Sequence, residues 1–248
     1  MTRARQASGP SRSRREVARS ATEADFATRG THPQNGHMHV DHLTFAAGPD
    51  GLKAEVERLG ELLGARFRDG GFHPRFGTRN NILPLADHRY IEVVEVLEHP
   101  AAEKAPFGQA VRARSEMGGG WLGWVVSVPD LAPYEQRLGR AAVTGSRHFP
   151  DGRLLEWQQI GVKGLMTDPQ LPYFIKWTSD ESVLPRALGG DLQLIEIEIA
   201  GTEKRVEDWI GAEVDGNFDG VNIRFTAPNG QPGLDAATFH TAQGPVRI

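Results

Sequence analysis

Two side chains that could carry out chemistry, His42 and Glu92, each lie inside a short stretch with a strand-like pattern, "VDHLTFAA" and "RYIEVVEV". Imidazole and carboxylate are common ligands of Zn, Fe, Mn, Ni and Co ions. The same two groups can also act as a general base and the group that orients it. If the two strands are neighbours in a sheet, His42 and Glu92 can lie close together although they are far apart in the sequence. The two residues therefore predict either a metal site or an acid/base site.

Strand alternation predicts which way these residues face. Alternate residues of a strand share a face, so Leu43 and Phe45 are predicted opposite His42. The face of His42 is predicted to hold small or polar residues, namely Val40, Thr44 and Ala46. Glu92 is predicted to share its face with Tyr90 and Val94. This pattern is consistent with a His42 that faces a cleft.

A second group of polar residues lies in "HPRFGTRN". His73 precedes a proline, and Thr78 and Asn80 follow Gly77, so we predict that these three residues recognise a substrate. The alternative for His73 is a loop histidine that bonds a local carbonyl. Thr78 and Asn80 could instead satisfy backbone groups in the turn at Gly77.

Three further residues are predicted to complete the binding site from the second half of the chain. Trp124 and Trp177 would give one side of the cleft an apolar wall, and Lys176 would add a positive charge there. The alternatives are tryptophans in the core and a solvated lysine on the outer face.

The alternative for His42 and Glu92 is that both have purely structural roles. His42 could be a cleft histidine that bonds a neighbour without any metal. A buried carboxylate is costly unless it is paired or coordinated, so Glu92 needs a partner. That partner could be His42 itself, Arg79 or Arg89.

The elements that position these residues repeat along the chain. A strand, a turn and an amphipathic helix with 3.6-residue spacing are followed by strands, and a similar order starts again near Trp121 and near Leu192. The helix positions are Leu52, Val56, Leu59, Leu62 and Leu63, and Gly64 is predicted to end this helix. We predict an α+β fold in which paired βαβββ modules form a curved mixed sheet around a cleft. The predicted units are a disordered N-terminal tail (1–37), a first βαβββ module (38–117), a second βαβββ module (118–190) and a C-terminal βαββ half-module (191–248).

Composition narrows the function class. The chain has 248 residues, 39% hydrophobic and 24% charged, with a formal charge of −4, which favours neither nucleic acid nor an anionic membrane as a partner. It has no cysteine, which excludes disulfides, thiolate metal sites and a cysteine nucleophile. The tail is rich in Arg, Ser, Thr and Gly. An organelle transit peptide or a start at Met38 are alternatives to plain disorder.

The sequence resembles a known family. "VDHLTFAAGPDGLKAEVERLGELLGARF" and "GGFHPRFGTRNNILPLADHRYIEVVEV" are similar to the glyoxalase-like domain of the vicinal-oxygen-chelate (glyoxalase/bleomycin resistance/dioxygenase) superfamily. The resemblance extends over about residues 38–248 and includes "GWVVSVPDL" and "LPYFIKWT". Its most specific part is "HPRFGTRN", within the pattern H-P-x-x-G-T-x-N.

The resemblance implies a divalent metal ion held by a His on the first strand and a Glu on the last strand of each module. In the first module these ligands are His42 and Glu92. In the second module Gly123 or Trp124 stands at the first position, and Ile175 and Lys176 stand where a carboxylate is expected. A lysine ammonium repels a divalent ion. The implied site for Zn, Fe, Mn, Ni or Co is therefore degenerate.

The resemblance also implies a function. It suggests a lyase, isomerase or dioxygenase-like enzyme for a compact oxygenated substrate, in which His42 and Glu92 provide metal ligation or acid/base chemistry. The alternative is a non-catalytic protein that sequesters a drug or another small molecule. Both interpretations imply a small-molecule ligand, no nucleic acid, no membrane, a cytoplasmic location, and a monomer or homodimer.

Overall fold

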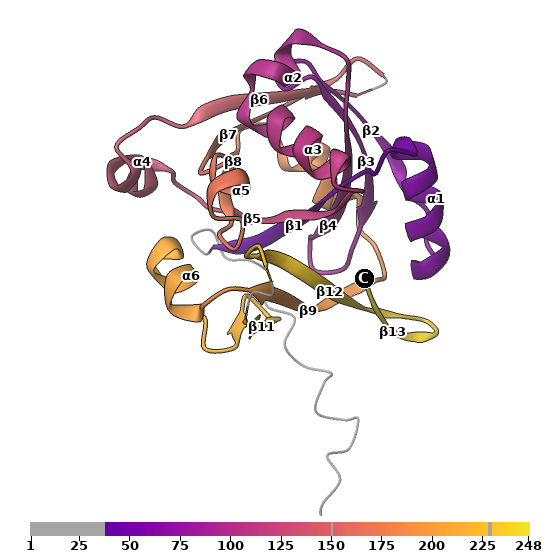
Figure 1. The fold of residues 1–248 in the computed structure, drawn as a ribbon. Helices are drawn as coiled ribbons and strands as arrows, with labels where there is room; N and C mark the ends of the chain where they lie inside the picture. The colour runs from indigo at the N-terminus through magenta and orange to yellow at the C-terminus, as the bar shows by residue number, and fades with distance from the viewer. Residues whose placement is uncertain (1–37, 150, 228–229) are drawn as a thin grey trace, which may run out of the picture. The chain divides into compact units, whose positions relative to one another are not determined.

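A barrel and a second sheet make up the described part of the chain. The computed structural model describes residues 38–248, apart from 150, 228 and 229, and the predicted tail at 1–37 lies outside the described residues. The barrel is closed, with the strand order β1-β4-β3-β2-β6-β7-β8-β5 (Figure 1). The other sheet has five strands in the order β10-β11-β9-β12-β13. The predicted α+β class with paired modules is confirmed.

Two modules of the same element order form the barrel. The first module consists of β1 (His39–Ala46), α1 (Gly51–Leu63), β2 (Arg68–His73), β3 (Thr78–Pro84) and β4 (Tyr90–Val96). The second module consists of β5 (Gly120–Ser127), α4 (Ala132–Leu138), β6 (Val143–His148), β7 (Leu154–Ile160) and β8 (Tyr173–Trp177). In each module the first strand pairs in parallel with the last, β1 with β4 and β5 with β8. The modules join through β1 and β5 on one side, and through β2 and β6 on the other.

The first helix follows the predicted pattern with one exception. Leu52, Leu59 and Leu63 are buried, whereas Leu62 is 50% exposed and does not belong to the buried face. Gly64 ends α1 in the left-handed conformation, with φ of 64°, as predicted.

Several elements are additional to the predicted ones. Two short helices, α2 (Pro100–Lys104) and α3 (Pro106–Glu116), connect the modules, and α5 (Gly164–Thr167) precedes β8. Two 3₁₀ turns, η2 (Glu181–Val183) and η3 (Pro185–Leu188), lead to the C-terminal unit. That unit contains β9 (Gln193–Ala200), α6 (Glu203–Ile210), β10 (Asn217–Phe218), β11 (Val221–Thr226), β12 (Gly233–Thr241) and β13 (Gly244–Arg247). Within residues 38–248 as described, no helix is long and apolar enough to cross a membrane.

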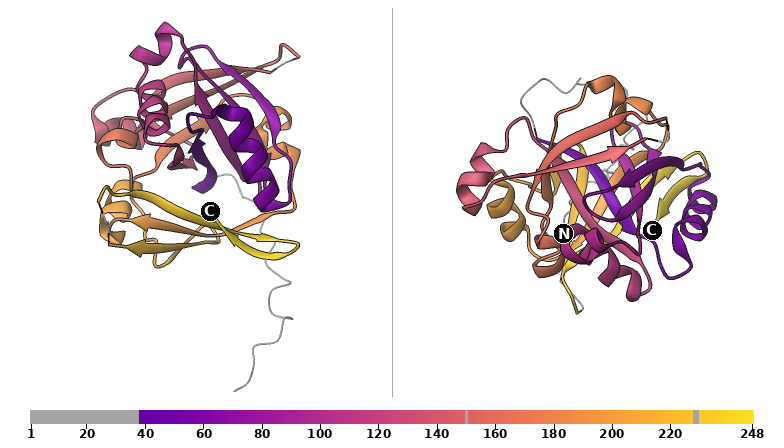
Figure 2. Two further views of the ribbon diagram at one scale, coloured as in Figure 1. Left: turned by 45° about the vertical axis from the view of Figure 1, so that its right-hand side comes forward. Right: turned by 90° about the horizontal axis from the view of Figure 1, so that it is seen from above.

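The five-stranded sheet packs against the outer face of the barrel (Figure 2). The barrel and the sheet belong to one compact unit. One apolar cluster joins Leu43 of β1 and Trp124 of β5 to Ile197 of β9 and Phe239 of β12. A second cluster fills part of the barrel interior. The outer faces of β1 and β5 are therefore committed to packing, and the inner faces are left for the polar residues.

A β-bulge at Asp41 changes the predicted alternation of β1. The register to β5 shifts between Val40 and His42, so Asp41 is an extra residue in the ladder. Val40 belongs to the outer cluster with Leu43, and its predicted place on the face of His42 is wrong. The bulge places two adjacent residues, Asp41 and His42, between outward-facing neighbours. Both are buried, with 0% and 4% of their surface exposed.

The C-terminal sheet also holds the start of β1. Asp219, in the β10–β11 turn, accepts a hydrogen bond from Val40 N at 2.9 Å and pairs with His39 at 2.6 Å and with Arg89 at 2.9 Å. Arg89 is buried, so removal of its partner leaves a costly charge. Burial raises the pKa of Asp219, but the hydrogen bond from His39 and the charges of His39 and Arg89 outweigh this and lower it.

We expect Asp219→Asn to lower the free energy of unfolding by about 1–3 kcal/mol, because it leaves the buried Arg89 with only the more exposed Asp87, at 3.4 Å, as its ion-pair partner. Since the folded-state pKa of Asp219 is lowered, the stabilisation is present above the unfolded-state pKa and is lost as the pH falls below about 4. Urea unfolding at pH 7 and at pH 3 measures both effects. Asp215→Asn, an exposed aspartate in the preceding turn, is the matched control. Equal stability of the two variants at pH 7 contradicts the prediction.

Candidate functional site

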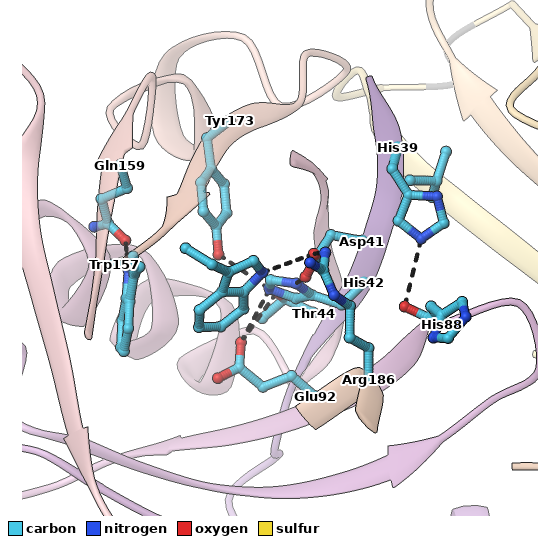
Figure 3. Close-up of polar contacts among 12 residues, drawn as sticks. His39, Asp41, His42, Thr44, His88, Glu92, Trp157, Gln159, Tyr173 and Arg186 are labelled. Atoms are coloured by element: carbon cyan, nitrogen blue, oxygen red, sulfur yellow. Dashed lines mark hydrogen bonds and ion pairs between the residues drawn. The ribbon is translucent and has the colours of Figure 1, made fainter. Parts of the chain in front are cut away.

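The bulge places the Asp41 carboxylate beside the His42 ring. Asp41 Oδ1 lies 2.8 Å from His42 Nδ1 (Figure 3). Asp41 Oδ2 accepts a hydrogen bond from Trp177 Nε1 at 2.9 Å. Arg186 Nη1 is 3.5 Å from the same Oδ2. Burial raises the pKa of Asp41, but the hydrogen bonds from His42 and Trp177 and the charges of His42 and Arg186 outweigh it and lower the pKa. Asp41 is thus an ionised, fully buried acceptor.

The Asp41 carboxylate fixes which nitrogen of His42 carries the proton. An ionised carboxylate can only accept, so Nδ1 of His42 is the donor, and Nε2 of the neutral ring is left as an acceptor. Nε2 points to the Tyr173 hydroxyl at 3.4 Å and to Glu92 Oε2 at 3.9 Å (Figure 3). The His42 ring stacks on Tyr90 with 4.4 Å between centroids, which holds its plane. A histidine held with Nε2 towards the cavity can take a proton or bind a metal.

Glu92 is held by neutral donors. Its Oε1 accepts from Asn80 Nδ2 at 2.6 Å, and its Oε2 accepts from Thr44 Oγ1 at 3.2 Å. His42 Nε2 and His73 Nε2 each lie 3.9 Å from one of the two oxygens. The two arginines considered as alternative partners bind elsewhere, Arg79 to Glu95 and Arg89 to Asp219. The carboxylate therefore lies between two imidazoles.

His73 stands on the opposite side of Glu92 from His42. Its Nδ1 lies 2.9 Å from Thr78 Oγ1, and its side chain is 4% exposed. Burial lowers the pKa of His73 to about 4; the charge of Glu92 raises it, and those of Arg147 and His42 lower it further. His73 is therefore neutral at neutral pH. When the Thr78 hydroxyl donates to Nδ1 of His73, the proton of the neutral ring is on Nε2, which faces Glu92.

These residues surround a cavity of about 30 Å³ inside the barrel, large enough for a water or a small group of atoms. Its lining mixes polar and aromatic residues, namely His42, His73, Phe76, Asn80, Tyr90, Glu92, Phe107, Arg147, Leu155, Trp157, Gln159, Tyr173, Ile175 and Trp177. Gly145 permits the wall at Trp157, because a Cβ there would lie 2.3 Å from the indole ring. Burial raises the pKa values of Tyr90 and Tyr173, so both phenols stay protonated.

The predicted site residues do not all meet here. Five of the predicted residues line the cavity, namely His42, His73, Asn80, Glu92 and Trp177. Thr78 does not line it, but its hydroxyl lies 2.9 Å from Nδ1 of His73.

Two predicted substrate contacts lie elsewhere. Trp124 is fully buried in the outer cluster, where its Nε1 donates to the Gln170 carbonyl at 3.1 Å. The Lys176 side chain is 38% exposed, and its ammonium lies 3.8 Å from Asp130. Tyr173, Ile175 and Trp177 take the inward face of β8, so strand alternation turns Lys176 outward.

Several polar residues of the site were not among the predicted site residues. Asp41 lies in the bulge and holds His42, and Tyr90, Arg147, Gln159 and Tyr173 line the cavity. The alternation in "YIEVVEV" and "YFIKW" places Tyr90 on the face of Glu92 and Tyr173 on the face of Trp177. That signal was available for the tyrosines. Arg147 gives no such signal, because arginine is normally read as a surface residue.

The parallel strand pairs show which residues of the two modules are equivalent. In the first module His42 is opposite Tyr90 and Thr44 is opposite Glu92. In the second module Val125 is opposite Tyr173 and Ser127 is opposite Ile175. The tyrosine of each pair is thus retained.

Val125 therefore takes the place of His42, and Ile175 takes the place of Glu92. This alignment, which takes Tyr90 and Tyr173 as equivalent, differs from the predicted one, which places Gly123 or Trp124 at the first ligand position. Both replacements are aliphatic and buried.

The donor set does not fit a four-ligand metal centre. Val125 and Ile175 offer no donor atom, and the Arg147 guanidinium in the same cavity disfavours a cation. Across residues 38–248, with 150, 228 and 229 left aside, no three His, Cys, Asp or Glu side chains are grouped so that they could hold a metal ion. The arrangement instead suits proton transfer by His42 beside a fixed carboxylate.

Comparisons with known proteins agree with the fold. The model of the glyoxalase-like domain family matches residues 40–214. A hypothetical protein from Staphylococcus aureus has a similar structure, with a TM-score of 0.60 at 15% identity over 85% of this chain and 98% of that chain. Methylmalonyl-CoA epimerase from Mycobacterium tuberculosis gives a TM-score of 0.38 at 15% identity over 59% of this chain and 91% of that chain. The Streptomyces coelicolor epimerase in complex with 2-nitronate-propionyl-CoA gives 0.40 at 17% identity over 59% and 98%. No curated protein matches the sequence.

The family match extends from the start of β1 to the residues just after α6. It covers more than half of the chain and includes every strand of the barrel. The similarity to the S. aureus protein shows a shared fold. The chain belongs to the glyoxalase-like domain family.

Proposed function

We propose that the chain is a small-molecule enzyme that transfers a proton on a compact oxygenated substrate, as an isomerase or a lyase does. One observation carries the proposal: Asp41 holds His42 so that Nε2 faces a cavity shared with Glu92 and Tyr173. A catalytic base needs an acceptor atom at the substrate and a partner that fixes its tautomer. The buried Asp41 carboxylate supplies that partner.

The proposed reaction starts at a carbon next to a carbonyl group. His42 Nε2 removes a proton from this carbon, and the electron pair of the C–H bond moves to the carbonyl oxygen to give an enolate. The charge that forms on the imidazole is stabilised by Asp41 at 2.8 Å and by Glu92 at 3.9 Å.

Tyr173 is the group placed to stabilise the enolate oxygen. Burial keeps its hydroxyl protonated, so it can donate a hydrogen bond to the developing negative charge. Return of the proton from Nε2 to a different carbon, or to the other face of the same carbon, gives an isomerase. Departure of a group next to the enolate gives a lyase.

Glu92 acts as a positioning residue and as a fixed negative charge. Asn80 and Thr44 occupy one lone pair on each of its oxygens, which prevents rotation of the carboxylate. Its charge is unfavourable for an anionic group close to it, so the end of the substrate near His42 is expected to be neutral in the ground state.

We expect His42→Asn to abolish proton exchange. Wild-type protein in D₂O should replace the α-hydrogens of a panel of small carbonyl compounds (pyruvate, hydroxyacetone and glycolaldehyde) with deuterium, followed by ¹H NMR. Loss of the base should slow exchange by about 10²–10⁴-fold. His240→Asn, an exposed histidine on β12, is the matched control and should exchange as wild type does.

Binding without proton exchange would distinguish the binding protein from the enzyme. If wild type binds small molecules in the panel but catalyses no exchange, the protein is a binding module and the enzyme proposal fails. The aliphatic residues Val125 and Ile175, at positions equivalent to His42 and Glu92, are the observation that favours this alternative.

The donor set predicts independence from metal. Elemental analysis of purified wild type is expected to find no near-stoichiometric Zn, Mn, Fe, Ni or Co, and proton exchange should survive chelation. His42→Ala and Glu92→Ala are the comparison variants. Near-stoichiometric metal in wild type that disappears in both variants would show that these two ligands suffice, and the metal-free reaction would be wrong.

The lowered pKa of His73 predicts a pH-dependent stability. The unfolded chain binds a proton at His73 below about pH 6.5, whereas the folded chain does so only below about pH 4, so stability falls as the pH drops through this window. His73→Gln removes this contribution, which amounts to about 3 kcal/mol at most. Urea unfolding of the variant should depend less steeply on pH between 6.5 and 4. His240→Gln should keep the wild-type slope, and an unchanged slope in His73→Gln would contradict the assignment of a neutral, buried His73.

A further inference from the structure

Arg147 is a buried cation that the proposed reaction does not use. It stands on the inward face of β6, opposite Leu155 of β7, and only 2% of it is exposed. It lines the same cavity as His42 and Glu92. A buried arginine is rare unless it is paired, because its guanidinium remains charged in proteins.

The guanidinium has unsatisfied donors. Among the residues that the structure describes, Arg147 Nε and Nη2 find no hydrogen-bond acceptor. No carboxylate of the described ranges lies within ion-pair distance of it either, and both oxygens of Glu92 already accept from Asn80 and Thr44. Burial lowers the pKa of Arg147, while electrostatic interactions with Tyr90, Glu92 and Asp69 raise it.

Aromatic packing holds the guanidinium in place without satisfying it. Its central carbon lies 4.8 Å from the centre of the Phe149 ring. Arg153 contacts the same ring at 4.9 Å, but its side chain is 57% exposed. The two arginines therefore differ in burial, in access to the cavity and in pairing, because Arg153 donates to Asp151 at 2.8 Å.

We propose that Arg147 receives the carboxylate of the substrate, and that the site takes small carboxylic acids with a carbonyl or hydroxyl group on the adjacent carbon. This inference rests on the proposed function, because it names the substrate class for the same site. A planar carboxylate matches the fork of N–H groups that Arg147 offers. Glu92 repels an anion, so the carboxylate lies at Arg147 and the reacting carbon lies at His42. The small cavity favours a ligand of a few heavy atoms.

The test uses the full chain and isothermal titration in a phosphate-free buffer. The probes are glycolate, glyoxylate and pyruvate, with hydroxyacetone as the neutral counterpart of pyruvate and inorganic phosphate as a different oxyanion. We expect saturable binding of at least one carboxylate, and hydroxyacetone weaker by about 10-fold or more. Arg147→Met should weaken carboxylate binding by about 10–100-fold. Arg153→Met, the matched control on the same aromatic ring, should bind as wild type does.

Thermal unfolding distinguishes a binding role from a structural one. Removal of an unpaired buried charge should leave the midpoint of Arg147→Met equal to that of wild type or higher. A large drop in the midpoint would mean that Arg147 holds the fold together, and the proposal would fail. It would also fail if Arg147→Met bound carboxylates as wild type does, if phosphate bound and no carboxylate did, or if no probe bound.

His42→Asn separates this inference from the proposed function. The variant lacks the base but retains Arg147, so it should still bind carboxylates while it exchanges no protons. Carboxylate binding without exchange in wild type would leave the role of Arg147 intact and reject the enzyme. If wild type exchanged the protons of neutral carbonyl compounds but bound no carboxylate, the role of Arg147 would be rejected and the enzyme proposal would stand.

Discussion

The candidate site depends on one buried carboxylate. Asp41 has no exposed surface and interacts with three parts of the chain: His42 on the same strand, Trp177 on β8, and Arg186 in the connection to the C-terminal unit. A buried charge is stable only when its lone pairs are occupied, so these partners and the carboxylate fix one another. The bulge is what brings Asp41 inward. Without the extra residue, alternation would turn either Asp41 or His42 away from the cavity.

The two modules have the same order of strands and helices, but their side chains differ at equivalent positions of the site. Equivalent positions hold His42 and Val125, or Glu92 and Ile175, while tyrosine is retained at Tyr90 and Tyr173. The two histidines and the carboxylate that line the cavity therefore belong to the first module, and the second module contributes Arg147, Gln159 and Tyr173 beside apolar and indole side chains. A symmetric pair of modules would place four donors around a central ion, whereas this asymmetric pair places Ile175 where a second carboxylate would stand. Burial of Glu92 and His42 in this cavity lowers the local dielectric constant, which strengthens the interaction between Glu92 and a positively charged His42.

Much of the first module could be predicted because its patterns are regular. The 3.6-residue spacing and Gly64 define α1, and the two alternating runs joined by a short turn define β3 and β4. The connecting helices α2 and α3 were missed: α2 has only five residues, and the buried residues of α3 are Phe107, Gly108, Ala110 and Val111, so neither helix shows a complete apolar stripe. The bulge leaves a mark in "VDHLTF", because two polar residues, Asp41 and His42, stand together between Val40 and Leu43 and break the alternation. The prediction of a regular strand overlooked this break and so misplaced Val40. Trp124 was placed by counting from the predicted modules, which the register shifts between β1 and β5 make unreliable. The outward direction of Lys176 follows from the alternation of β8.

The two modules of the barrel are joined by extensive strand pairing on one side and by little on the other. Polar residues of the site lie on both sides. Strands β1 and β5 pair along most of their length and are backed by the outer apolar cluster, so the side with Asp41 and His42 is rigid. Strands β2 and β6 meet through one residue pair, Phe72 with His148. The neighbours of these two residues in sequence are His73 and Arg147, both of which line the cavity. Few ladder hydrogen bonds therefore join the two modules beside His73 and Arg147. A carboxylate bound to Arg147 would add charge-assisted hydrogen bonds at the place where the backbone supplies the fewest.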